Sequence, residues 1–255
     1  MNKFSEIIKN SAYQRQSRII LALDIQPSKT IDYVKKAVHL IESLGSHICA
    51  VKVNRHLTLP LGLGVEIRKI LKVCDKVGLP TIMDCKINDV GSTNKVMAQH
   101  YFEIGFDAVT ANPFVGWEDG LQSVFEMAET FDRGVLLLVY MSHKGSWEGY
   151  GIMANDPNSG KTRPLYNLFA EKALAWGADG AIVGATYPEK ILEVFNILGN
   201  KVPIYSPGIG VQGGRVNLAI SSGAKYLIVG RSIIHSNDPV ATAKELKIMA
   251  GRLKL

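Results

Sequence analysis

The sequence predicts a single (β/α)₈ barrel, the TIM-barrel class, from three observations. Short apolar segments alternate with longer segments of helical period, as expected for parallel strands that are buried on both faces. A phrase of glycine, one or two small or polar residues and a strand recurs at 105–112, 177–184 and 223–230. The length of 255 residues matches the roughly 250 residues typical of this fold.

Eight segments are predicted to be strands: 18–24, 47–53, 80–84, 108–112, 135–140, 180–184, 203–207 and 226–230. Eight such units without a break in composition favour a closed barrel over the alternative, an open doubly wound sheet. We therefore expect one domain over residues 1–255.

Start and stop signals predict helices between these strands. Ser28 or Thr30 can cap a helix that Gly45 ends. The further signals are Ser92 as a cap, Gly105 as a helix end, and Asp238 with Pro239 as the start of the last helix.

Two segments lie outside the repeating pattern. Residues 1–17 are predicted to hold a short leading helix with Phe4, Ile7 and Ile8 on one face. Residues 141–164 form a long connection after the fifth strand, rich in Gly, Ser, Asn and Pro. Because long loops without secondary structure are often functional, we expect an active-site loop that forms part of a lid.

Composition bears on location and partners. The cysteines Cys49, Cys74 and Cys85 lie in apolar stretches and fit no zinc spacing, and their odd number argues against a disulfide framework. We expect a cytoplasmic chain that is neither exported nor bound to a membrane. The net charge of +6 comes from scattered Lys and Arg, which favours a small anionic ligand over nucleic acid.

Charged or polar residues stand where several apolar strands end. In chain order they are Asp24, Lys52, Asp84 with Lys86 and Asp89, Asn112, Ser142 and Arg231. Because the working residues of such barrels lie at the carboxyl ends of strands, we expect an active site around Asp84, Lys86 and Asp89. In an extended strand, Asp84 and Lys86 point the same way. The alternative is a buried ion pair without catalysis.

Glycine-rich turns follow the last two strands, at 208–210, 213–214 and 230–231. Loops at these places form the usual phosphate site of such barrels, and Arg231 would add a guanidinium. The sequence therefore predicts a small phosphorylated substrate. It shows no His, Asp and Glu cluster of the kind that holds a metal, so no metal site is predicted.

Several motifs resemble the orotidine 5′-phosphate decarboxylase family over nearly the whole chain. They are LALD (21–24), VKV (51–53), DCKINDVGST (84–93), MSHKG (141–145), SPGIGVQGG (206–214) and IVGRSI (228–233). Related sugar-phosphate enzymes, such as 3-keto-L-gulonate 6-phosphate decarboxylase and hexulose phosphate synthase, carry a magnesium-binding glutamate where this chain has Lys52. The lysine therefore favours the decarboxylase branch.

The resemblance implies cofactor-independent conversion of orotidine 5′-monophosphate (OMP) to UMP and CO₂ in de novo pyrimidine biosynthesis. Lys86 would protonate C6, and Asp84 would lie beside the substrate carboxylate. Asp24 and Lys52 would bind the ribose hydroxyls, with Lys52 also part of the charged catalytic array. Ser142 would hydrogen-bond the pyrimidine.

The resemblance also assigns the remaining groups. Gln212 and Arg231 would hold the phosphate with backbone help near Gly230, and Pro207 would line the pocket. Asp89 and Thr93 would reach into the neighbouring subunit's site, so that the family pattern implies a homodimer with shared active sites.

Four alternatives remain open from the residues themselves. They are a magnesium-dependent sugar-phosphate enzyme of the same superfamily, a Schiff-base aldolase that uses Lys52 or Lys86, a phosphate-ligand binding protein without catalysis, and a nucleic-acid-binding protein supported by net charge alone.

Overall fold

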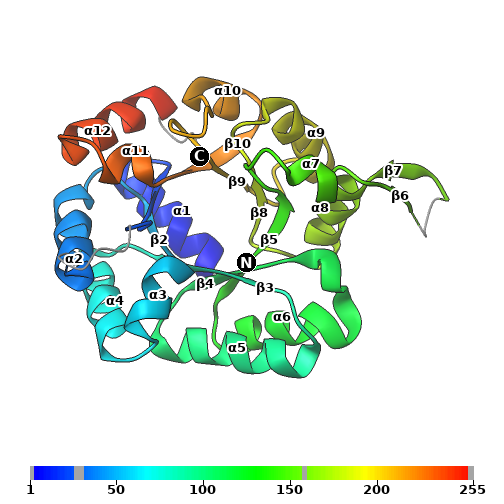
Figure 1. Cartoon of the computed structure of the whole chain (residues 1–255), viewed down its shortest axis with the longest axis horizontal. Coiled ribbons are helices and arrows are strands. Elements are labelled where there is room, and N and C mark those ends of the chain that lie inside the picture. Colours follow the sequence, from blue (N-terminus) through cyan, green and yellow to red (C-terminus); the bar gives the residue numbers. More distant parts are fainter. Residues whose placement is uncertain (1–2, 26–31, 157–159, 252–255) are drawn as a thin grey trace.

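Eight parallel strands close into a barrel in the order β1-β10-β9-β8-β5-β4-β3-β2, with helices around it (Figure 1). The computed structural model describes residues 3–25, 32–156 and 160–251. The barrel strands are β1 Ile19–Ala22, β2 Ala50–Asn54, β3 Thr81–Ile87, β4 Ala108–Ala111, β5 Gly134–Tyr140, β8 Gly180–Val183, β9 Ile204–Pro207 and β10 Ala224–Val229. The closed barrel is thus confirmed and the open sheet is rejected.

Helices connect the strands and cover the outside of the barrel. They are α2 Tyr33–Leu44, α3 Arg55–Leu61, α4 Val65–Val77, α5 Gly91–Ile104, α6 Gln122–Thr130, α8 Leu165–Ala175, α9 Pro188–Leu198, α10 Val216–Ser221, α11 Arg231–Ile234 and α12 Pro239–Ala250. The β4–α6 connection adds the short turns η1 Pro113–Val115 and η2 Trp117–Leu121. In α2 the buried residues Ala37, Leu40, Ile41 and Leu44 follow the helical period and make one apolar face.

Helix α2, the first of the helices predicted between strands, begins later than expected. Asp32 is its N-cap, and its side chain accepts a hydrogen bond from the Lys35 backbone N–H at 2.9 Å. The expected cap at Ser28 or Thr30 is therefore wrong, and both residues lie outside the described residues. Aspartate serves this position because its carboxylate satisfies a free N–H group of the first turn.

Of the other predicted helix boundaries, one is wrong and three are confirmed, the first of these being Gly45 at the end of α2. Helix α5 starts at Gly91, so Ser92 lies inside the first turn and is not the cap. Gly105 ends that helix in the left-handed region, at φ 113°. Asp238 caps α12 by accepting from the Ala241 N–H at 2.9 Å.

The leading helix, α1 Lys3–Arg15, closes the amino end of the barrel. Its residues Phe4, Ile8 and Ala12 are buried against the side chains that fill the barrel interior. The Phe4 ring lies over Gly134 at the start of β5, where a Cβ atom would come within 2.5 Å of the ring. Because this end is filled, the opposite end is where a site can open.

Replacing Phe4 with alanine is expected to lower the free energy of unfolding by about 3–5 kcal/mol, the usual cost of deleting a buried aromatic ring. Urea titration would measure it. Tyr13→Ala on the same helix is the control, since Tyr13 is 48% exposed. Equal effects of the two substitutions on the free energy of unfolding would contradict the conclusion that Phe4 of α1 helps to close the amino end of the barrel.

The connection 141–164 has more structure than expected. It contains the short helix α7 Ser146–Gly149 and an antiparallel hairpin of β6 Met153–Asn155 and β7 Thr162–Pro164, which projects away from the barrel (Figure 1). Arg163 ties the hairpin to its surroundings, since it donates to Glu171 on α8 and to Asp156, both at 2.6 Å. The expectation of a loop without secondary structure is therefore wrong.

Candidate active site

A cavity opens at the carboxyl end of the barrel, and nine of the eleven predicted site residues line it. These nine are Asp24, Lys52, Asp84, Lys86, Ser142, Pro207, Gln212, Gly230 and Arg231. They come from the ends of six strands, β1, β2, β3, β5, β9 and β10, and from the loops that follow them. Barrel closure is what brings these distant segments together.

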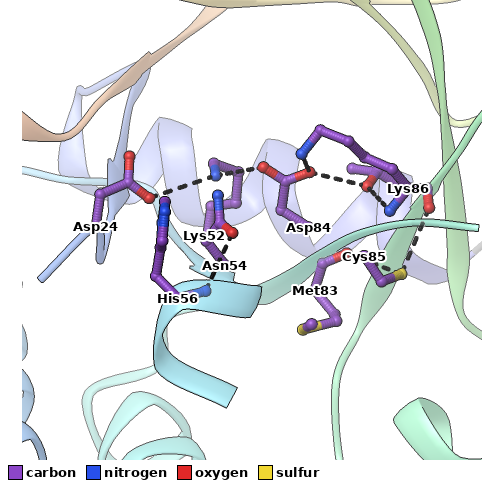
Figure 2. Close-up of polar contacts among 9 residues, drawn as sticks. Asp24, Lys52, Asn54, His56, Met83, Asp84, Cys85 and Lys86 are labelled. Atoms are coloured by element: carbon purple, nitrogen blue, oxygen red, sulfur yellow. Dashed lines mark hydrogen bonds and ion pairs between the residues drawn. The ribbon is translucent and has the colours of Figure 1, made fainter. Parts of the chain in front are cut away.

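Alternating charges cross the floor of this cavity (Figure 2). The Lys52 Nζ lies 2.6 Å from Asp84 Oδ2 and 4.0 Å from Asp24 Oδ1. The Lys86 Nζ lies 2.7 Å from Asp84 Oδ1. Asp84 thus holds one ammonium group with each carboxylate oxygen. Each buried charge has an opposite neighbour, which offsets the cost of taking it out of water.

The ion pairs determine the charge states of Asp84 and Lys52, the two most buried residues of the charged array. Burial by itself would raise the pKa of Asp84, but the charges and hydrogen bonds of Lys52 and Lys86 outweigh it and hold that pKa below its usual range. Burial would lower the pKa of Lys52, but Asp84 and Asp24 outweigh it and raise that pKa. Lys52 is therefore an ammonium group at neutral pH and a poor Schiff-base nucleophile.

Replacing Asp84 with asparagine is expected to lower the free energy of unfolding at pH 7 by about 3–5 kcal/mol, since two lysines lose their carboxylate. Because the folded pKa of Asp84 is lowered, its contribution is present above the unfolded pKa, about 3.9, and is lost as the pH falls through the folded value. Urea titrations should therefore show a smaller difference between wild type and variant at pH 3 than at pH 7. A difference that stays constant with pH would contradict this assignment.

The backbone around Lys86 is not extended, which corrects one step of the sequence argument. Lys86 has φ of 51°, and the pairing of β3 with β4 shifts between Met83 and Ile87. Asp84 and Lys86 therefore meet because the strand bulges, rather than because an extended strand sends alternate side chains the same way. Between them, the buried thiol of Cys85 contacts the carbonyl oxygens of Met83 and Thr110 at 3.6 and 3.5 Å.

Two predicted site residues, Asp89 and Thr93, do not line this cavity. Both are exposed; Asp89 lies two residues before α5 begins and Thr93 lies in the first turn of that helix. Asn94, which is fully buried, accepts a hydrogen bond from the Asp89 N–H at 3.0 Å and donates to the carbonyl oxygens of Asp89 and Gly120. The turn is thus held in place while the Asp89 carboxylate stays at the surface.

Another part of the cavity lining combines glycine turns with polar side chains. The Ser142 hydroxyl donates to Gln212 Oε1 at 2.9 Å. Gly208 has φ of 98°, and a Cβ atom there would lie 2.7 Å from the same Gln212 oxygen. Arg231 is the first residue of α11 and follows Gly230, and both residues line the cavity. Such a set of donors suits a phosphate group.

Sequence reasoning missed two polar residues that line the cavity, and Asn112, which it noted as a polar residue at a strand end, lies outside the cavity together with Asp89 and Thr93. Asn54 and Thr110 line the cavity. Asn54 could have been found from its position two residues after Lys52, and Thr110 as a polar residue within an apolar strand. Asn112 instead caps η1 by accepting from the Phe114 N–H at 3.1 Å, so its side chain has a structural role.

Three further findings concern residues 3–25, 32–156 and 160–251. Within these ranges no three His, Cys, Asp or Glu side chains gather closely enough to hold a metal ion. In the same part of the chain, no helix combines the length and the apolar character needed to cross a membrane. Cys49, Cys74 and Cys85 are free and buried.

Comparison with known proteins gives consistent matches. Residues 17–246 match the "Orotidine 5′-phosphate decarboxylase / HUMPS family". The orotidine 5′-phosphate decarboxylase of Methanosarcina barkeri is 33% identical over 91% of this chain and 94% of its own length. Among solved structures, the enzyme of Methanocaldococcus jannaschii complexed with inhibitor BMP has a TM-score of 0.77 and 26% identity, over 92% of this chain and 98% of that one.

A longer protein also resembles the chain. The UMP synthase of Leishmania donovani has a TM-score of 0.82 and 26% identity over 98% of this chain, which spans 56% of that chain.

Proposed function

Because the chain belongs to the orotidine 5′-phosphate decarboxylase / HUMPS family, we propose that it converts OMP to UMP and CO₂ with Lys86 as the proton donor to C6. The observation that carries this proposal is the array of Asp24, Lys52, Asp84 and Lys86 in one cavity. A lysine at position 52 gives that array a cation where the related sugar-phosphate enzymes have a magnesium-binding glutamate.

The reaction breaks the bond between C6 and the carboxylate carbon. The bonding electrons stay on C6 as CO₂ leaves, and no adjacent carbonyl absorbs the charge. A fixed ammonium group beside C6 stabilises this charge and then delivers a proton to it. Lys86 suits this task, because Asp84 holds its Nζ at 2.7 Å. Solvent returns the proton to Lys86 after the product leaves.

In this proposal Asp84 also acts on the substrate carboxylate. Its lowered pKa keeps it ionised, and the substrate carboxylate would lie beside it. Two like charges at close range oppose each other, and this opposition disappears as the substrate carboxylate becomes neutral CO₂. Asp84 also orients Lys52 and Lys86, so the same carboxylate both positions the lysines and promotes the loss of CO₂.

The remaining groups bind the parts of the substrate that do not react. Asp24 and Lys52 would bind the ribose hydroxyls, and Ser142 would hydrogen-bond the pyrimidine. Arg231 and Gln212 would hold the phosphate with backbone N–H groups near Gly230, while Pro207 lines the wall. Binding energy from the phosphate can orient the ring without touching C6.

The proposal includes a cytoplasmic homodimer with shared sites. Asp89 and Thr93 face outward beside two exposed apolar side chains, Val90 at 60% and Val96 at 52%. An apolar surface next to an outward carboxylate fits a partner subunit whose cavity receives Asp89. Three free buried thiols suit a reducing compartment.

The direct test follows the ultraviolet absorbance of OMP in the presence of excess chelator. Rapid loss of absorbance with release of UMP supports a metal-independent decarboxylase. No loss with a folded, dimeric sample would reject the substrate, and turnover of a sugar phosphate only with magnesium would identify the other branch of the superfamily.

A further inference from the structure

Thr110, on β4, makes two hydrogen bonds inside the active-site cavity. Its hydroxyl donates to Asp84 Oδ1 at 3.0 Å and accepts from the backbone N–H of Lys86 at 2.9 Å. The residue is 1% exposed, so water does not replace these contacts. One hydroxyl therefore contacts both the carboxylate and the backbone of the lysine in the proposed catalytic pair.

The strand register explains why a side chain has to supply an acceptor here. Met83 pairs with Val109, and the next pair is Ile87 with Ala111. Three residues of β3, at 84–86, therefore face the single residue Thr110 on β4. In a regular ladder a backbone carbonyl would accept from such an N–H group, and a buried N–H group without a partner is costly. At Lys86 the Thr110 hydroxyl takes the place of that carbonyl.

The bulge also places Lys86 in an uncommon conformation. Its φ of 51° lies in the left-handed region, which residues other than glycine, asparagine and aspartate seldom adopt. Such a conformation persists only where the surroundings enforce it. The hydrogen bond from its N–H to Thr110 is one such restraint, and the bond from its Nζ to Asp84 is the other.

These contacts form a closed ring through Thr110, Asp84 and Lys86. We propose that Thr110 is a positioning residue that fixes the bulged backbone of Lys86 and one oxygen of Asp84, and so sets the place from which the lysine delivers its proton. The inference rests on the proposed function. It concerns the residues that contact Asp84 and Lys86, and not the groups assigned to the phosphate.

The matched test replaces Thr110 by valine, which keeps the shape and removes the hydroxyl, and by serine, which keeps the hydroxyl. Thr81→Val is the control, because Thr81 is equally buried and its hydroxyl likewise bonds a carboxylate, that of Asp107, at 2.9 Å. Thr81 begins β3 at the amino end of the barrel, away from the cavity.

Thr110→Val is expected to lower kcat by about 10²-fold with little change in KM, as a small misplacement of a reacting group does. Thr110→Ser and Thr81→Val should keep kcat near the wild-type value. The proposal is overturned if Thr110→Val keeps the wild-type kcat, if valine and serine lower it equally, or if only KM changes. If the valine variant does not fold, Thr110→Ser and Thr110→Ala give the same comparison.

A crystal structure of the Thr110→Val variant provides a readout that does not depend on the substrate. Lys86 is expected to leave its positive φ, or its Nζ to move away from Asp84, and unchanged geometry would overturn the proposal. Wild-type turnover measured in the same series separates the outcomes. A wild type inactive on OMP rejects the proposed function, and the crystal structure still decides the role of Thr110.

Discussion

Replacing Lys86 with alanine is expected to lower kcat for OMP decarboxylation by about 10⁴-fold. The substitution removes the proton donor and the cation that stabilises charge at C6, and each contributes a factor of 10² or more in comparable sites. The change is measured by the loss of OMP absorbance under saturating substrate. KM should change much less, because the groups assigned to the phosphate and the pyrimidine remain in place.

Two companion variants sharpen this result. Lys69→Ala removes a lysine whose side chain is 55% exposed on α4, and it should leave kcat unchanged. Lys86→Arg keeps a cation but offers a group that does not give up its proton near neutral pH. Arginine should therefore restore little of the turnover. Near-complete recovery with arginine would show that charge alone matters, and a folded Lys86→Ala variant with wild-type kcat would reject the assignment of Lys86.

Mixing two inactive variants is expected to restore turnover if the sites are shared. Asp89→Ala and Lys86→Ala should each be nearly inactive with an intact fold, because Asp89 is exposed on the surface. A hybrid dimer contains one site with its own Lys86 and with Asp89 from the partner. After random exchange of subunits in an equal mixture, about one quarter of all sites should be intact.

The control is a mixture of Lys86→Ala with Lys52→Ala. Both lysines line the cavity of a single chain, so no hybrid of these two variants contains an intact site. Recovery in the first mixture alone supports a site completed by the partner. If neither mixture recovers although labelled subunits have exchanged, the shared site is wrong. Recovery in both would show reversion or contamination.

The fold and most of the cavity could be predicted from the amino-acid sequence. Continuously apolar strands bounded by glycine turns identify a barrel, because only parallel strands buried on both faces tolerate such runs. Once the barrel is assumed, the strand ends give the position of the site. Asp24, Lys52, Asp84 and Lys86 could be named in this way because a charge at the end of a buried strand has few structural explanations.

Two local features were not predicted from the sequence: the N-cap of α2 and the contacts that hold the hairpin of β6 and β7. Asp32 caps α2, and Arg163 holds the hairpin of β6 and β7 through Glu171 and Asp156. A run rich in Gly, Ser and Asn does not reveal such contacts, since local preferences there are weak.

The bulge at Lys86 was decided only by the tertiary structure. Side chains alternate along a strand unless a bulge places extra residues of that strand opposite one residue of its neighbour. The register depends on how the two strands pair, and neither strand's sequence shows it alone. The sequence marks Thr110 only as a polar residue within an apolar strand, and it does not show which groups its hydroxyl contacts. In the barrel three residues of β3 face Thr110, and its hydroxyl is the group that meets both Asp84 and Lys86.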